Sequence, residues 1–251
     1  MIHKSPLIQG RFIKRYKRFF ADIDVDGKMV VAHVPNTGSM KTCMEDNAEC
    51  FLTHNPDPKR KLQWTLERIK INQSLVGVNT GIPNNLVFEA WQNQLIPHWT
   101  KFDRGQKEVK INDESRLDMT LWNSKDFPQL EKLNMDFIQN NEDLKKSKTK
   151  IHFIEIKNVT MAIDQTAMFP DAVTSRGAKH IEELVKLIDL GHTCEMVYVI
   201  QREDINTFKI ASDIDPIYDK ALTKAKNNGL LVTALKVNFG PNETKITGLF
   251  K

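Results

Sequence analysis

The sequence predicts an α/β protein, α+β overall, in which a small β-barrel or sandwich at residues 1–75 precedes a layer of alternating strands and helices at residues 76–251. Several short apolar stretches bounded by turn signals fall within the first 75 residues, which is typical of a small all-β unit. Beyond them, strand patterns alternate with helical periodicity, which is typical of an α/β layer. With 40% hydrophobic and 27% charged residues, the composition excludes collagen-like, disordered and coiled-coil classes.

The first part is predicted from a hairpin signal. Asp26-Gly27 favours a tight turn between two strands, the first of which alternates in polarity. A polar loop at residues 55–61 separates two further apolar stretches. The strands expected in this part lie at residues 21–25, 28–34, 50–52 and 64–69.

The second part is predicted from helical periodicity and capping residues. Pro83 suits a first helical turn, Gly191 suits the end of a helix whose apolar positions fall at residues 181–188, and Asp215-Pro216 opens a helix that ends by Gly229. Residues 123–149 are polar and rich in Lys and Asn, and we expect a mobile or partly helical insertion there. The expected strands lie at residues 107–111, 116–122, 151–156, 194–200 and 230–239. The strand at residues 194–200 is apolar enough to be buried on both faces.

Basic residues are concentrated at the start of the chain. The net charge is +4, but residues 1–71 hold 13 Lys/Arg and 8 Asp/Glu, which gives +5, whereas residues 72–251 hold 23 and 24, which gives −1. Residues 1–21 carry six Lys/Arg and no carboxylate. Such a segment is either a solvated basic edge or a contact surface for a polyanion.

The sequence also bounds the compartment. No run of about 18 apolar residues occurs, and the N-terminus lacks the apolar stretch of a secretory signal, so we expect a cytoplasmic protein without a membrane partner. Three cysteines without a C-x-x-C pair fit a reducing compartment better than a disulfide framework. The histidines at positions 33, 54, 98 and 192 have no ligand spacing, and we expect them in loops or at the surface.

Charged residues interrupt two apolar strands of the second part. Asp118 lies within residues 117–121, and Glu155 and Lys157 project from one face of a strand because side chains alternate along it. Burying such charges is costly unless a partner compensates. The arrangement is either a strand-edge ion pair with a solvent-facing Asp118 or a site whose carboxylate oxygens hold Mg²⁺ or Mn²⁺.

The order of these residues resembles the PD-(D/E)xK nuclease superfamily. An acid-bearing helix with Glu89 is followed by a strand with Asp118, a strand with Glu155 and Lys157, and a helix with basic residues. The resemblance implies that Asp118 and Glu155 bind a divalent metal and that Lys157 orients the attacking water. Leu117 stands where the superfamily has the Pro of its Pro-Asp pair.

Longer strings narrow the resemblance to one family. They are Ser5-Pro6-Leu7-Ile8, Arg15-Tyr16-Lys17-Arg18-Phe19, Pro35-Asn36-Thr37-Gly38-Ser39-Met40, Gly77-Val78-Asn79-Thr80, Glu155-Ile156-Lys157-Asn158-Val159-Thr160, Phe169-Pro170-Asp171-Ala172-Val173, Arg176-Gly177 with Lys179-His180, and Ile200-Gln201-Arg202. Over nearly the whole chain they resemble the sugar fermentation stimulation protein A family of bacteria and archaea. The resemblance implies an OB-type β-barrel at residues 1–75 and a restriction-endonuclease-like mixed β-sheet flanked by helices at residues 76–251. It also implies a cytoplasmic protein that binds DNA through backbone contacts and is linked to regulation of maltose use.

The resemblance and the basic segment together assign candidate residues. The catalytic candidates are Glu89, Asp118, Glu155, Lys157 and Gln201, with Asp118 and Glu155 as ligands of Mg²⁺ or Mn²⁺. The candidates for nucleic-acid contact are Arg15, Tyr16, Lys17, Arg18, Asn36, Lys59, Arg60, Arg116, Arg176, Lys179 and His180. The string Asn36-Thr37-Gly38-Ser39 suits either a phosphate-holding turn or an ordinary loop, and His180 suits either a phosphate contact or a helix surface.

Three functions are compatible with this sequence. The first is DNA binding by the basic barrel, through phosphate contacts and base stacking. The second is a magnesium-dependent deoxyribonuclease that cleaves phosphodiester bonds through Asp118, Glu155 and Lys157. The third is a catalytically silent protein that regulates sugar genes through a partner. The sequence leaves open whether the chain forms a homodimer.

Overall fold

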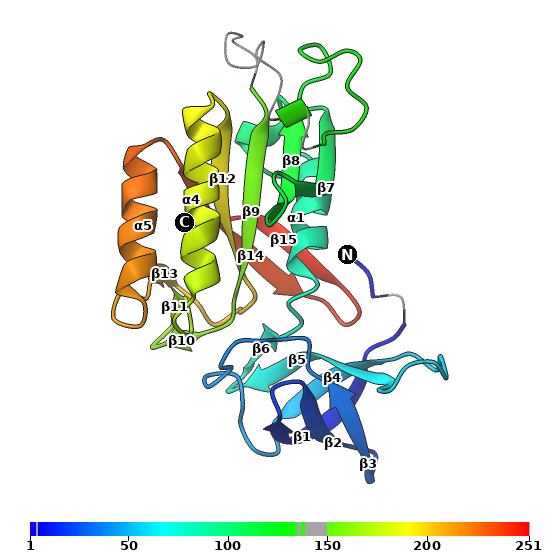
Figure 1. Cartoon of the computed structure of the whole chain (residues 1–251). Helices are drawn as coiled ribbons and strands as arrows, with labels where there is room; N and C mark the ends of the chain where they lie inside the picture. The colour runs from blue at the N-terminus through cyan, green and yellow to red at the C-terminus, as the bar shows by residue number, and fades with distance from the viewer. Residues whose placement is uncertain (4, 135–136, 139–149, 251) are drawn as a thin grey trace.

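The computed structural model describes residues 1–3, 5–134, 137–138 and 150–250, and it has two units built on separate six-stranded sheets (Figure 1). The first unit, called the barrel domain below, lies at the bottom of the view. Its strands are β1 (Ile8–Tyr16), β2 (Phe20–Val25), β3 (Lys28–His33), β4 (Glu49–His54), β5 (Trp64–Ile71) and β6 (Ser74–Gly77).

The barrel domain is a closed β-barrel. Its strand order is β3-β2-β1-β4-β5-β6, and a parallel pairing of the edge strand β3 with β5 at Ala32↔Trp64 closes the sheet. The hairpin between β2 and β3 turns at Asp26 and Gly27, which have φ values of 51° and 79°, the left-handed conformation that a two-residue hairpin loop requires. The predicted barrel is therefore confirmed, and closure excludes the sandwich alternative.

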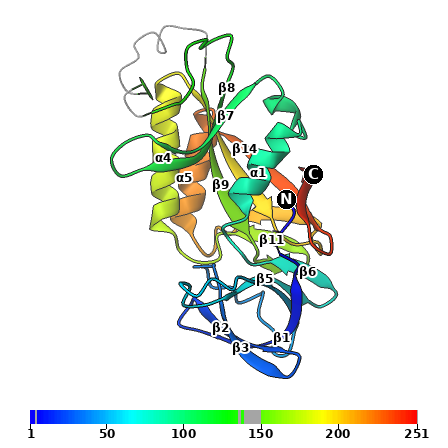
Figure 2. The same cartoon turned by 90° about the vertical axis from the view of Figure 1, so that its right-hand side faces the viewer.

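The second unit, called the sheet domain below, has a mixed sheet of order β15-β14-β12-β9-β8-β7. The strands β9, β12 and β14 run parallel, which requires crossover connections, and α4 and α5 provide them. Its sheet strands and helices are α1 (Pro83–Gln92), η1 (Pro97–Trp99), β7 (Arg104–Lys110), β8 (Arg116–Trp122), β9 (His152–Val159), α4 (Ser175–Asp189), β12 (Thr193–Ile200), α5 (Pro216–Asn227), β14 (Leu231–Phe239) and β15 (Thr244–Leu249). Helices α4 and α5 cover one face of the sheet and α1 covers the other (Figures 1 and 2).

Local sequence explains where the helices begin and end. Thr174 caps α4 by accepting the Gly177 N–H at 3.0 Å, and Asp215 caps α5 by accepting the Tyr218 N–H at 2.9 Å. Gly191 ends the α4 segment with a φ of 93°. The strand β12 is buried from its second residue onward, as its apolar run predicts. No helix of the described ranges is both long enough and apolar enough to cross a membrane.

Two parts of the sheet domain go beyond the sequence prediction. A small third sheet, absent from the prediction, consists of β10 (Ala162–Ile163), β11 (Thr166–Phe169) and β13 (Thr207–Ile210). In the predicted insertion at 123–149, residues 135–136 and 139–149 lie outside the described residues, so its predicted mobility stays a prediction. Its described residues Leu133 and Ile138 are buried in the core beneath α4, so the segment contributes to packing.

Two buried arginines join the domains in opposite directions. Arg68 on β5 donates to the carbonyl oxygens of Gly240 and Glu243, each at 2.7 Å, in the hairpin between β14 and β15. Arg202, which follows β12, donates to the Thr42 carbonyl of the barrel domain at 3.1 Å. Each guanidinium donates to backbone carbonyl groups of the other domain, so the two domains are joined from both sides of the interface by buried hydrogen-bond donors.

A buried carboxylate holds the segment after α1 against the sheet. Glu195 on β12 has no solvent exposure and lies 3.0 Å from His98 Nε2 and 2.9 Å from His152 Nε2, and it accepts the Trp99 indole N–H at 2.8 Å. His98 and Trp99 flank each other in η1, so the three contacts fix that turn to β9 and β12. His98 is exposed and His192 lies in the loop before β12, as predicted, but His98 also pairs with this carboxylate and His192 is buried.

We expect Glu195→Ala to lower the free energy of unfolding at pH 7 by about 3 kcal/mol, because it removes the acceptor of several buried donors. Burial alone would raise the pKa of Glu195, but hydrogen bonds from His152 and His98 outweigh it and hold the pKa far below its usual range. A carboxyl pKa lowered by folding stabilises the protein at neutral pH, and that contribution disappears as the pH falls below the usual range. Urea unfolding at several pH values measures both effects. Glu182→Ala, an exposed change on α4, should stay within about 0.5 kcal/mol, and an equal loss in both variants would contradict the prediction.

Candidate functional site

Asp118 lies on β8 beside the central strand β9. Its Oδ2 accepts the backbone N–H of Ile156 at 2.8 Å, and its Oδ1 accepts the Asn84 side-chain amide at 2.8 Å. Asn84 is the second residue of α1, and Pro83 begins that helix because a first-turn residue needs no N–H donor. The first turn of α1 therefore supplies a donor to Asp118, and Asn84 is a site residue that sequence reasoning missed.

Glu155 and Lys157 lie two residues apart on β9 and meet on the face covered by α4. Glu155 is 2% exposed, and its Oε1 accepts a hydrogen bond from Lys157 Nζ at 2.7 Å. His180 of α4 also contacts this oxygen through its Nδ1, while its Nε2 accepts from Arg176 Nε at 3.3 Å. The other oxygen, Glu155 Oε2, is buried and has no hydrogen-bond partner among the described residues.

The electrostatic environments of the two carboxylates differ. Burial and the nearby charge of Glu155 raise the pKa of Asp118 to about 6. Burial would also raise the pKa of Glu155, but the contacts with His180 and Lys157 outweigh it and leave this pKa below its usual range. Glu155 is thus held ionised, whereas ionisation of Asp118 beside it is less favourable than ionisation of a free carboxyl group.

The two carboxylates fit a divalent cation. A cation would give the orphaned Glu155 Oε2 a partner and would cancel the repulsion between the two acids. No three His, Cys, Asp or Glu side chains converge on one point in the described part of the chain. Two carboxylates would leave several coordination positions to water, which is the mode of binding that Mg²⁺ prefers.

The structure does not bring the other two catalytic candidates to this pair. The Glu89 carboxylate is 45% exposed and lies 2.7 Å from the N-terminal ammonium of Met1. Gln201 is fully buried where the domains meet; its carbonyl accepts the Gly77 N–H at 2.9 Å, and its side chain donates to Asn158 Oδ1 at 2.6 Å. Gln201 thus lies between the domains, one strand away from Glu155.

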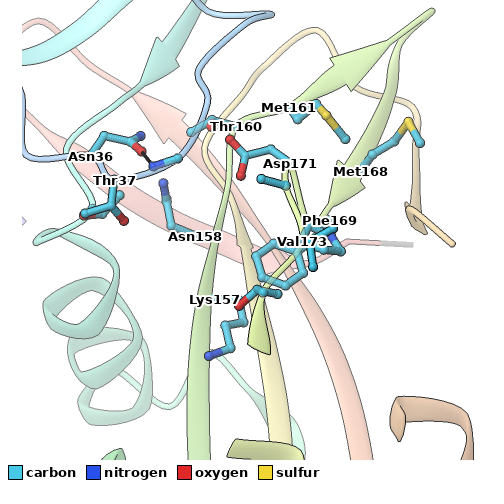
Figure 3. Close-up of a pocket in the computed structure, with 15 residues that line it drawn as sticks. Asn36, Thr37, Lys157, Asn158, Thr160, Met161, Met168, Phe169, Asp171 and Val173 are labelled. Atoms are coloured by element: carbon cyan, nitrogen blue, oxygen red, sulfur yellow. Dashed lines mark hydrogen bonds between the residues drawn. The ribbon is translucent and has the colours of Figure 1, made fainter. Parts of the chain in front are cut away.

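Arg15 and Asn36 hold a loop of the barrel domain, which we call the 36–40 loop. The Arg15 guanidinium donates to the carbonyl oxygens of Asn36 at 2.7 Å, Gly38 at 3.1 Å and Ser39 at 3.2 Å. Asn36 is buried, and its Oδ1 accepts the Gly38 N–H at 2.8 Å (Figure 3). Both side chains, predicted as nucleic-acid contacts, are engaged within the protein.

Asp171 of the sheet domain binds the same loop from the other side. Its Oδ2 accepts the N–H and hydroxyl of Ser39 at 2.7 and 3.1 Å and the Met40 N–H at 3.4 Å. A Cβ on Gly38 would lie 2.5 Å from this oxygen, so the close approach requires glycine at that position. Sequence reasoning did not assign Asp171 a role, although it lies in one of the strings that carry the family resemblance.

The remaining basic candidates differ in how free they are. Lys17, Arg18 and Lys59 are exposed, and Arg60 lies in the same loop as Lys59 with a contact to Thr65. Two others pair with carboxylates: Arg116 lies 3.5 Å from Glu108 and Lys179 lies 2.6 Å from Glu114. Tyr16 donates to Asp22 at 3.0 Å and stacks on Phe20 with 5.7 Å between the ring centroids.

Comparison with known proteins covers both domains. The family model described as "SfsA N-terminal OB domain" matches residues 13–78, and "Sugar fermentation stimulation protein RE domain" matches residues 81–243. A sugar fermentation stimulation protein homolog of Bdellovibrio bacteriovorus is 42% identical, with 97% of this chain and 95% of that protein covered. The chain belongs to the sugar fermentation stimulation protein family. A homolog from Pelagibacter ubique in the same family is 38% identical over 96% of this chain and 94% of that protein.

A solved structure of the family shares the fold. It is described as Pyrococcus furiosus SfsA in complex with Ca²⁺, and it matches with a TM-score of 0.81 at 23% identity, with 100% of this chain and 96% of that chain covered. The family expectation of an OB barrel followed by a mixed sheet with helices is confirmed. The roles of individual residues stay predictions.

We expect Asp118 to titrate near pH 6 in the metal-free protein, two units above its ordinary value of 3.8. Because folding raises this pKa, the metal-free protein should lose stability as the pH rises through that interval. Glu155→Gln removes the neighbouring charge, so the pKa of Asp118 should fall, while burial keeps it above the ordinary value. The carboxyl ¹³C shift measured against pH follows the titration, and Glu89→Gln is the control that should leave it unchanged. A midpoint at the ordinary value in the unmodified protein would contradict the prediction.

Proposed function

We propose that this protein binds DNA and hydrolyses its phosphodiester bonds at a divalent metal, Mg²⁺ or Mn²⁺, held by Asp118 and Glu155. The observation that carries the proposal is the buried, unpartnered oxygen of Glu155 beside a second carboxylate and the Lys157 ammonium. A metal bound there would lower the pKa of a water ligand and offset the charge of a phosphate. The description of the Pyrococcus furiosus protein as a Ca²⁺ complex supports a cation site in the family.

The side chains around the pair have distinct tasks in this proposal. Asn84 and the Ile156 N–H keep both oxygens of Asp118 oriented, and His180 keeps Glu155 ionised. Lys157 brings a positive charge to the position where an attacking oxygen and the phosphate meet. Pre-organised charges of this kind stabilise a transition state more than they stabilise a substrate.

DNA binding is assigned to the barrel domain because OB barrels commonly bind single strands through a basic groove and stacking. The exposed Lys17, Arg18 and Lys59 are the basic side chains available to phosphate groups. The relatives are named for stimulation of sugar fermentation. We therefore extend the proposal to a cytoplasmic protein whose contact with DNA affects sugar use, maltose included.

DNA affinity should fall steeply with salt, because each neutralised phosphate releases counterions. Lys17→Ala and Arg18→Ala should each weaken binding and reduce the slope of log K against log [salt] by about one unit. Lys226→Ala removes the same charge from an exposed position on α5 and should change neither quantity. Fluorescence anisotropy with labelled DNA between 50 and about 200 mM salt measures this. DNA affinity that does not change with salt would show that the turn carrying Lys17 and Arg18 is not the contact surface.

Cleavage should require Mg²⁺ or Mn²⁺, the carboxylate of Asp118 and the ammonium group of Lys157. Asp118→Asn and Lys157→Ala should each reduce the cleavage rate by about 100-fold or more, since each removes an electrostatic contact made at the reacting phosphate. A nicking assay on plasmid DNA with and without metal measures the rates.

Two further variants sharpen the nicking assay. Asn84→Ala should slow cleavage because it frees Asp118, whereas Glu89→Gln should stay within about twofold because Glu89 is exposed and bound to the N-terminus. Equal cleavage by every variant would identify a contaminant or a different site. DNA binding without cleavage under all metals would favour the catalytically silent regulator.

A further inference from the structure

A cavity of about 340 Å³ lies between the two domains and begins at Lys157 (Figure 3). Residues 36–38 of the 36–40 loop and Thr80 form one side of it, and residues 157–158, 160–161 and 168–174 of the sheet domain form the rest. Lys157 both lines this space and donates to Glu155, so this side chain lies between the cavity and the carboxylate pair. A ligand in this cavity would lie beside Lys157, and therefore next to a group bound at the proposed metal site.

The walls of this cavity are held in place before any ligand arrives. Arg15 binds three carbonyl groups of the 36–40 loop, and Asp171 binds its amide groups from the sheet domain. The Asn36 side chain donates to the Val78 carbonyl at 3.1 Å, which fixes the start of the loop to the end of the barrel. A cavity with fixed walls orders a ligand without a further loss of loop entropy.

One side of the cavity is apolar and the other carries free hydrogen-bonding groups. Phe169 packs its ring against Tyr198 and Tyr218, with both centroid distances 5.4 Å, and Val173 beside it is 72% exposed. On the polar side, the Asn158 amide nitrogen and the Thr37 hydroxyl have no hydrogen-bond partner within the described ranges of the chain. An apolar wall facing amide and hydroxyl groups is suited to a heterocycle with apolar faces and polar edges, such as a nucleobase.

We propose that this cavity takes one unpaired base of the DNA strand, next to the phosphate bound at Asp118 and Glu155. The inference rests on the proposed function and names its substrate class, single-stranded DNA or a duplex that is locally open. The space suffices for one nucleoside but not for stacked base pairs, so a paired base has to leave its helix before it enters. Unstacking costs least where the strand is already single.

Cleavage of a single strand and of the same sequence in a blunt duplex tests the substrate class. The single strand should be preferred by about tenfold or more, because a base in the duplex must first be unpaired and unstacked before it enters the cavity. Val173→Glu, which places a charge at the exposed apolar wall, and Thr37→Trp, which fills the polar side, should both reduce kcat/KM for the single strand by about tenfold. Both positions are exposed, so the variants should fold.

Ile217→Glu is the matched control, because Ile217 is 68% exposed and does not line this cavity. It should behave as the unmodified protein. Equal cleavage of single strand and duplex, or equal rates for Val173→Glu and Ile217→Glu, would overturn the proposal.

A second measurement keeps the cavity testable if no cleavage occurs at all, which would contradict the proposed hydrolysis alone. Single strands with 2-aminopurine at successive positions are bound without metal, and the emission should change at one position only. The change should persist in Ile217→Glu and vanish in Val173→Glu and Thr37→Trp. Emission that is unchanged at every position, or changed equally in all variants, would overturn the assignment of the cavity to a base.

Discussion

A buried carboxylate, Glu155, and a half-buried one, Asp118, lie on adjacent apolar strands, and they are the constraint on which the sheet domain depends. Burying two like charges in a sheet is costly, and each must find donors from several elements. Asp118 obtains them from the first turn of α1 and from the backbone of β9, and Glu155 obtains them from Lys157 and from His180 of α4. The helices on the two faces of the sheet are therefore both fixed by the same pair, which leaves a single oxygen unsatisfied.

The position of the barrel domain follows from a similar requirement for polar partners. Arg68 and Arg202 reach across the interface in opposite directions, and both end on backbone carbonyls of the other domain. Asp171 adds a carboxylate that binds backbone amides of the 36–40 loop. The same loop forms one wall of the cavity beside Lys157, so the contacts that dock the two domains also set the shape of the cavity. A change that loosens the interface therefore also alters the space next to the carboxylate pair.

The sequence was sufficient to predict most elements but not the rotation of α1 about its axis. Apolar periodicity located the helix, and the only acidic residue on it, Glu89, was the natural candidate to join Asp118. Residues 84 and 89 are five positions apart, which separates them by about 140° around a helix, so they cannot both face the same carboxylate. Packing of Leu86, Val87 and Ala90 on the sheet decides which one does, and it selects Asn84. That packing depends on strands distant in sequence, as do the short strands β10, β11 and β13, which have too few residues to show a period.

The basic segment shows why charge counts overstate the surface available to a polyanion. Three basic residues of equal formal charge lie almost side by side in the sequence: Arg15, Lys17 and Arg18. The guanidinium of Arg15 donates to carbonyl groups of the 36–40 loop, whereas Lys17 and Arg18 extend from a turn with positive φ. An arginine has enough donors in one plane to satisfy several carbonyls at once, which a lysine cannot do in the same geometry. The positive charge of the barrel domain therefore has two physical uses. Arg15 holds the 36–40 loop, which forms one wall of the cavity, and only the exposed Lys17 and Arg18 remain free to attract phosphate. A nucleic-acid strand bound by Lys17 and Arg18 would therefore lie next to a cavity wall that Arg15 keeps in place.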